Sequence, residues 1–97
     1  METYKKLAQN QKVTIYENQG NQLILLPVNR TYKGKSPVYY LEKKPKGGKS
    51  KYISGLFKTQ DPAAFSGDTQ DPITGMKSMF RLVFLDGGAA VKIEGRL

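Results

Sequence analysis

The most regular pattern along the chain is a set of short segments in which apolar and polar residues alternate, separated by glycine, proline and asparagine. Residues 12–17 alternate in this way, residues 18–21 (Asn-Gln-Gly-Asn) have turn chemistry, and residues 22–28 are mostly apolar. A period of two is typical of half-buried β-strands, so this region predicts a first hairpin. Pro27 near its end favours an edge or a bulge there.

A second hairpin is predicted around Gly47-Gly48, between strands at Pro37–Lys46 and Lys49–Lys58. Two glycines reach positive φ freely, as both central residues of a type I′ turn must. Pairing outward from this turn gives Lys46–Lys49, Lys44–Lys51, Lys43–Tyr52, Leu41–Ser54, Tyr40–Gly55, Tyr39–Leu56 and Val38–Phe57.

This register predicts which side chains share a face, because directly opposed residues project to the same side of a sheet. Tyr39 and Tyr40 are neighbours and must point to opposite faces. The face predicted to be core holds Val38, Tyr40, Ile53, Gly55 and Phe57. The face predicted to be exposed holds Tyr39, Lys43, Tyr52, Ser54 and Lys58.

The remaining segments carry weaker patterns. Residues 1–10 predict either a loose arm or a short helix that begins after Thr3 and runs to about Leu7. Residues 59–76 predict a long loop anchored by Phe65, in which Thr-Gln-Asp-Pro occurs at 59–62 and again at 69–72; Asp-Pro pairs favour turns. Lys77–Leu85 predicts a strand with an apolar face of Phe80, Leu82 and Phe84, and after a turn Ala89–Glu94 predicts the last strand.

Together these segments predict a single all-β domain spanning residues 1–97. Its expected architecture is a five- or six-stranded antiparallel sheet curled into a small OB-like barrel. The alternative is a single curved sheet that dimerises to cover its apolar face. A homodimer is therefore one expectation.

Basic residues are concentrated in the first part of the chain. Residues 1–60 have a net charge of +9 and residues 61–97 a net charge of −1. Within residues 30–58, nine basic residues accompany one acid, Glu42, and five aromatic residues. Cations neutralise phosphates and aromatic faces stack on bases, so this mixture favours single-stranded nucleic acid over other anionic partners.

Composition also excludes several functions. Without any cysteine or histidine, the chain lacks thiol nucleophiles, the usual zinc ligands and the commonest general base. The aspartates of residues 61–71 match no calcium loop, and Gly-Gly-Lys-Ser at 47–50 lacks the rest of a P-loop. We expect no enzyme activity, no metal and no cofactor. A polar start and short apolar runs predict a cytoplasmic protein that does not contact membranes.

The predicted function is non-enzymatic, sequence-tolerant binding of single-stranded DNA, or of RNA. In this hypothesis Tyr39 and Tyr52 stack on bases, lysines of the second hairpin bind phosphates, and Arg30, Tyr32 and Lys33 extend the track. Arg81 is a further phosphate ligand, unless it pairs with a nearby aspartate. The candidate residues are Arg30, Tyr32, Lys33, Tyr39, Lys43, Lys44, Lys46, Lys49, Lys51, Tyr52, Lys58 and Arg81.

The same residues are compatible with alternative roles. Exposed lysines can simply be solvated and discourage edge aggregation, and the tyrosine face can pack against the long loop or a second subunit. A protein-interaction module, such as a phage-encoded inhibitor or adaptor with a basic hairpin, has an equally compact β architecture. A protein that binds duplex DNA is a third possibility.

The stretch from Pro37 to Lys58, a Lys- and Gly-containing hairpin with Tyr-bearing strands, resembles small single-stranded-DNA-binding proteins of phages and mobile elements, including OB-fold types. The resemblance covers about half of the chain. It implies cooperative coating of exposed strands during replication or recombination. The Gln-Asp-Pro loop and the lack of an acidic tail depart from that family's pattern.

Overall fold

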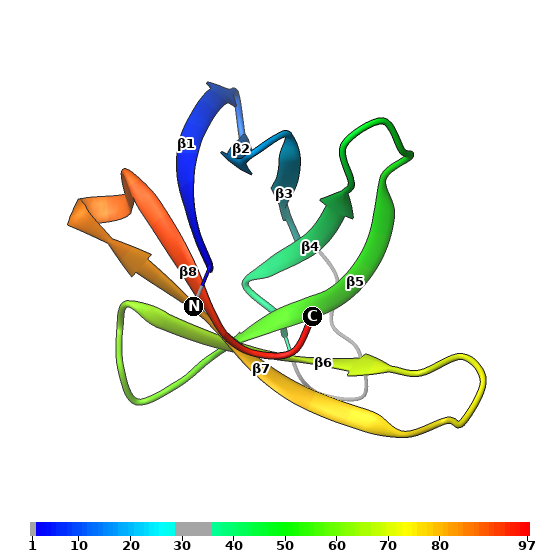
Figure 1. Cartoon of the computed structure of the whole chain (residues 1–97). Helices are drawn as coiled ribbons and strands as arrows, with labels where there is room; N and C mark the ends of the chain where they lie inside the picture. Colours follow the sequence, from blue (N-terminus) through cyan, green and yellow to red (C-terminus); the bar gives the residue numbers. More distant parts are fainter. Residues whose placement is uncertain (1, 29–35) are drawn as a thin grey trace.

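A computed structural model describes residues 2–28 and 36–97, in which eight antiparallel strands close into a barrel (Figure 1). Each strand pairs with its neighbours along the chain, and β1 pairs with β8 to complete the circle. A short 3-10 turn, η1 (Asp86–Gly88), joins the last two strands. The strands are β1 (Glu2–Asn10), β2 (Val13–Asn18), β3 (Asn21–Pro27), β4 (Tyr39–Lys44), β5 (Lys51–Lys58), β6 (Ala64–Gln70), β7 (Lys77–Leu85) and β8 (Ala90–Gly95).

The prediction of an all-β antiparallel sheet curled into a barrel is confirmed, but the expected count of five or six strands is wrong. The N-terminal segment, predicted to be a loose arm or a short helix, is strand β1. It pairs with β2 along residues 5–10 and with β8 along residues 2–5. Only Tyr4 in this strand is buried, so backbone pairing with both neighbours holds a segment that has no alternating apolar pattern.

The long loop predicted at residues 59–76 is also wrong, because it contains strand β6. This strand pairs with β7 along its whole length, from Ala64–Val83 to Gln70–Lys77. Its sequence, Ala-Phe-Ser-Gly-Asp-Thr-Gln, includes a single large apolar residue. Phe65 packs against the core, as predicted.

Strong local patterns located the other strands well. The first hairpin forms as β2 and β3 around Gln19-Gly20, whose φ values of +51° and +86° suit a two-residue turn. Strand β7 has the predicted bounds, and strand β8 differs from its prediction by one residue at each end. Phe80 and Leu82 are fully buried, and Phe84 packs against the core.

The barrel encloses its own hydrophobic core, in contrast to the alternative of a single sheet that needs a second copy to cover it. Alternate side chains of each strand project inward, as the period of two requires. The core consists of Tyr4, Tyr16, Leu23, Leu25, Leu41, Leu56, Phe80, Leu82, Val91 and Ile93.

The two ends of the barrel differ in chemistry. In a chain that runs up and down, alternate connections lie at the same end, so the β2–β3, β4–β5 and β6–β7 turns share one end, here called the tip end. At the opposite, aromatic end, the ring of Phe65 lies 5.4 Å from Tyr39 and 5.6 Å from Phe84. These edge-to-face contacts close that end with apolar material.

Strands β5 and β6 pair over only two positions, Phe57–Ser66 and Lys58–Phe65. The next link is a side-chain hydrogen bond, in which the Asp68 N–H donates to Ser54 Oγ at 3.1 Å. Beyond it, among the described residues, β5 pairs only with β4 and β6 only with β7. The β4–β5 and β6–β7 hairpins therefore diverge as separate projections of the tip end (Figure 1).

Candidate nucleic-acid interface

The β4–β5 hairpin carries five lysines within nine residues, and we call residues 43–51 the lysine hairpin. Its turn begins at Pro45, whose carbonyl accepts the Gly48 N–H at 2.9 Å. Only Gly47, with φ of +73°, has positive φ in this turn, which is the pattern of a type II turn. The predicted type I′ turn with both glycines at positive φ is wrong. The five lysines are Lys43, Lys44, Lys46, Lys49 and Lys51.

The register of the hairpin is partly as predicted. Tyr39–Leu56, Tyr40–Gly55 and Leu41–Ser54 are confirmed, but a bulge at Ile53 shifts the pairing by one residue toward the turn. Glu42 therefore opposes Tyr52 and Lys43 opposes Lys51, so the predicted pairs Lys43–Tyr52 and Lys44–Lys51 are wrong. One pair of like charges still lies directly across the two strands, where it is destabilising.

The lysine hairpin is held in place by the β2–β3 turn beside it. The backbone N–H of Lys46 donates to Asn21 Oδ1 at 3.1 Å. The aliphatic stem of Lys46 lies over Gly20, where a Cβ atom would come within 2.8 Å of Lys46 Cδ. The missing side chain of Gly20 thus leaves room for the lysine stem, and the two turns pack against each other.

No ion pair neutralises these five lysines within the part of the chain that the structure describes. Arg81 differs, since it lies 3.9 Å from Asp61 and 4.0 Å from Glu94. These partners compete with phosphate for Arg81, which lies in the middle of β7, away from the tip end of the barrel. Its predicted pairing with an aspartate is observed, so Arg81 is the weakest of the described phosphate candidates.

The predicted assignment of faces is reversed at Tyr39, Tyr40 and Ser54. From the bulge toward the turn it holds, because Ile53 packs against the core and Tyr52 is exposed, as predicted. Tyr39 points inward, where its ring meets Phe65 at 5.4 Å and Phe84 at 6.1 Å. Ser54, predicted to be exposed, is 4% exposed inside the barrel. The pairing was correct at these positions, but pairing shows which residues share a face and not which face is buried. The predicted availability of Tyr39 for stacking is therefore wrong.

Tyr40 takes the outward position and forms a pair with Tyr52 on the outer surface. Their ring centroids lie 5.8 Å apart with an angle of 78° between the planes. Tyr52 is 62% exposed, so most of its ring is free to contact a ligand. The sequence identified Tyr52 and missed Tyr40, although adjacent tyrosines in one strand signal that one of them faces outward.

The other sequence candidates lie apart from the lysine hairpin. Lys58 is exposed at the opposite end of β5, seven residues or about 23 Å from Lys51 along an extended strand. Arg30, Tyr32 and Lys33 lie outside the described residues. The described interface thus consists of the lysine hairpin and the outer tyrosine pair, with Lys58 as a separate cation.

Three large apolar side chains of the β6–β7 hairpin are exposed and were not predicted from the sequence: Ile73, Met76 and Met79. They fall within or beside the segment that was interpreted as a loop. The sequence did contain a signal for this exposure. Large apolar residues follow an Asp-Pro turn there without the alternating pattern that would place them in a core.

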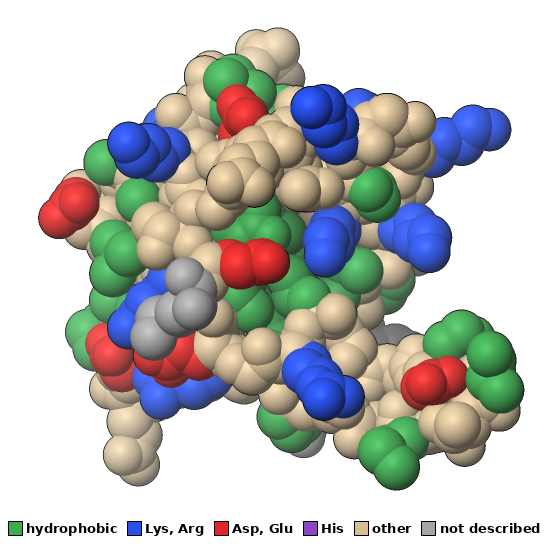
Figure 2. All heavy atoms as spheres, in the orientation of Figure 1, with side chains coloured by type: hydrophobic (Ala, Val, Ile, Leu, Met, Phe, Trp, Pro, Cys, Tyr) green, Lys and Arg blue, Asp and Glu red, His purple; other side chains and the backbone are tan. Residues whose placement is uncertain are grey.

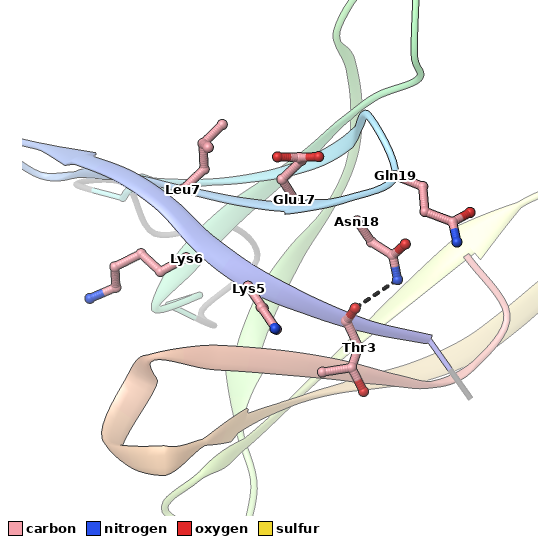
Figure 3. A pocket seen from close by; sticks show the side chains of 7 residues that line it. All are labelled: Thr3, Lys5, Lys6, Leu7, Glu17, Asn18 and Gln19. Atoms are coloured by element: carbon pink, nitrogen blue, oxygen red, sulfur yellow. Dashed lines mark hydrogen bonds between the residues drawn. The ribbon is translucent and has the colours of Figure 1, made fainter.

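A shallow depression of about 430 Å³ lies between β1 and the end of β2 (Figure 3). It forms where β1 leaves β2 to pair with β8, and the Asn18 side chain bridges the strands by donating to the Thr3 carbonyl at 2.7 Å. Its lining mixes Lys5 and Lys6 with Glu17. These side chains have a net charge of only +1, so the depression attracts anions less strongly than the lysine hairpin does.

Two further features bear on the kind of site present. In residues 2–28 and 36–97, no three His, Cys, Asp or Glu side chains gather as metal ligands would. The described residues also contain no helix with the length and apolarity needed to cross a membrane.

Comparison with known proteins gives no relative: no family model, no curated protein and no solved structure matches this chain. The function must therefore be argued from the chemistry of its own surface.

Proposed function

We propose that this protein binds single-stranded nucleic acid, DNA above all, without catalysis and with little sequence preference. The observation that carries the proposal is the lysine hairpin itself: five lysines without described ion pairs, next to an exposed tyrosine pair. Lysines neutralise phosphates and tyrosine faces stack on bases of any sequence, which is how single strands are bound without readout of base edges.

The like charges in the hairpin support an anionic ligand. Lys43 and Lys51 oppose each other, and their repulsion is relieved when phosphates bind to them. The contacts that hold the turn in place use the backbone N–H of Lys46 and its aliphatic stem over Gly20, and they leave its ammonium group available to bind a phosphate. Part of the entropy loss of ordering the hairpin therefore occurs on folding, before any ligand arrives.

The tyrosines supply the second part of the proposed mode of binding. Tyr52 presents its ring to solvent, and Tyr40 supports it edge-on from β4. A base stacked on Tyr52 would lie close to the lysines of the same hairpin, so that one nucleotide can use both. This role replaces the one that sequence analysis gave to Tyr39.

We further propose that the barrel is used in an OB-like manner, with a nucleic-acid strand lying across the outer surface of β4 and β5. An OB-fold is a partly open Greek-key barrel of five strands, whereas all eight strands here follow one another around the barrel. The proposed likeness therefore concerns a small closed β barrel as a binding scaffold, and not its connectivity.

The test is a titration of three fluorescently labelled ligands under identical conditions: oligo-dT, oligo-rU and a DNA duplex of equal length. The proposal expects tight binding of oligo-dT at moderate salt and weaker binding of the duplex. A preference for duplex would instead favour a double-strand-binding protein. Negligible binding of all three would refute the proposal and favour the protein-interaction module.

A further inference from the structure

The end of the β6–β7 hairpin exposes three large apolar side chains to solvent. Ile73 is 92% exposed, and Met76 and Met79 are each 69% exposed. Figure 2 shows hydrophobic side chains on the outside of the projecting lobe at the lower right, where Figure 1 draws this hairpin. We call residues 71–79 the apolar tip. Grouped apolar side chains on a projecting hairpin commonly mark an interaction site.

Hydrogen bonds hold the backbone of the apolar tip in one conformation. Asp71 Oδ1 accepts the N–H groups of Ile73 at 2.8 Å and Thr74 at 3.2 Å, and the Asp71 N–H donates to the Met76 carbonyl at 2.9 Å. The Gly75 N–H donates to the Asp71 carbonyl at 2.8 Å. The bonds from Ile73 and Thr74 lower the pKa of the Asp71 carboxyl. Because these backbone groups are satisfied internally, the tip can lose water at little cost.

The repeated Thr-Gln-Asp-Pro sequence offers an internal comparison. In the first copy, Asp61 Oδ1 accepts the Ala63 N–H at 2.9 Å, the same turn that Asp71 forms with Ile73. There the chain then enters the protein with the buried Ala64. In the second copy the residue after proline is Ile73, which points into solvent. The turn therefore needs no large side chain at this position, and folding does not explain an exposed isoleucine.

The apolar tip shares the tip end of the barrel with the lysine hairpin, because both connect strands that run the same way. Lys77, at the start of β7, is exposed beside it. Bases offer broad apolar faces, and aliphatic side chains such as Ile and Met are known to pack on or between them. An anionic strand drawn to the lysine hairpin would thus find an apolar surface on the neighbouring projection.

We propose that the apolar tip is a second contact for the bound single strand, in which Ile73 and Met76 pack on bases while the lysine hairpin holds phosphates. This inference rests on the proposed function and adds to it a separate base-contacting element. The bound nucleic-acid strand then runs from the lysine hairpin to the apolar tip, across the space between the two diverging hairpins.

The experiment measures oligo-dT affinity for the parent protein, for Ile73→Ala and for Ile73→Ala combined with Met76→Ala. Ile73→Ala reproduces the alanine of the first repeat copy, so thermal unfolding should not change. Complete burial of one methylene is worth about a fourfold change in affinity. If bound oligo-dT covers about half of the surface of the three carbons that Ile73→Ala removes, its binding should weaken about tenfold. The salt slope should not change, because no phosphate contact is lost.

Leu7→Ala is the matched control, since Leu7 is an exposed apolar residue (54%) on β1, outside both hairpins. It should bind oligo-dT like the parent. If the parent binds and Ile73→Ala binds equally well, the inference is overturned while the proposed function stands. The inference is also overturned if Ile73→Ala weakens binding to vesicles of mixed phosphatidylserine and phosphatidylcholine but leaves oligo-dT affinity unchanged. A parent that does not bind oligo-dT removes both proposals.

Discussion

Tyr39 and Tyr52 should respond in opposite ways to replacement by alanine, because one ring is internal and the other external. Tyr39 packs against two phenylalanines at the aromatic end. Truncation of a buried aromatic residue costs about 3–5 kcal/mol, and Tyr39 is half-buried, so we expect a loss of about 2–3 kcal/mol in the free energy of unfolding. For a domain of this size that lowers Tm by about 10–20 °C.

Tyr52→Ala should leave folding almost intact. It removes an exposed ring that contacts Tyr40, a pair worth about 1 kcal/mol or less at this exposure. Stacking of one base on an aromatic ring is worth about 1–3 kcal/mol, so oligo-dT binding should weaken by about five- to 150-fold. At temperatures where Tyr39→Ala remains folded, that variant should bind oligo-dT like the parent.

Urea unfolding followed by circular dichroism gives the stability of both variants, and titration of labelled oligo-dT at about 50 mM salt, where phosphate contacts are strong, gives their affinities. The reasoning is refuted if Tyr39→Ala is as stable as the parent but binds weakly, because Tyr39 would then face the ligand. It is equally refuted if Tyr52→Ala folds normally and binds with unchanged affinity.

Three further predictions concern the barrel and its charges. Gly67→Ala should lower the free energy of unfolding by about 2–3 kcal/mol in urea, because its Cβ would lie 2.6 Å from Phe80 Cζ; a loss under about 0.5 kcal/mol would contradict the close packing of β6 on the core. Lys51→Gln should raise stability by a few tenths of a kcal/mol by removing repulsion from Lys43, yet reduce the oligo-dT salt slope by about 0.7; a destabilised variant with an unchanged slope would be inconsistent with both roles. Burial, with a hydrogen bond to a neighbouring carboxylate, raises the pKa of the Tyr4 phenol, so folding favours the neutral phenol. The contribution of Tyr4 to folding stability is therefore complete below about pH 10 and is lost as the pH rises through the raised pKa. The urea midpoint should therefore fall above about pH 10, and less so in Tyr4→Phe.

The parts of the fold that the sequence predicted are those with local causes. An alternating pattern around a Gln-Gly turn located β2 and β3, and the apolar face of Phe80, Leu82 and Phe84 located β7. The clustering of lysines is a property of the sequence itself, so the basic hairpin was also found. Each of these signals lies within a short run of consecutive residues.

The parts that were missed depend on contacts between distant segments. Strand β1 is held by β8 from the other end of the chain, and β6 by its pairing with β7, although neither β1 nor β6 has a regular apolar pattern. The inward position of Tyr39 depends on Phe65 and Phe84 from other strands. The register of a hairpin does not show which of its two faces lies inside the barrel, because that is decided only when the other strands close around it.

The most direct test of the account is the salt dependence of oligo-dT binding by the parent protein. If the five lysines of the lysine hairpin each neutralise one phosphate, the logarithm of the association constant should fall with the logarithm of the salt concentration with a slope of about −3.5. Affinity should then drop about a hundredfold between 50 and 200 mM salt. A flat response over this range would contradict the claim that the hairpin binds a nucleic-acid backbone.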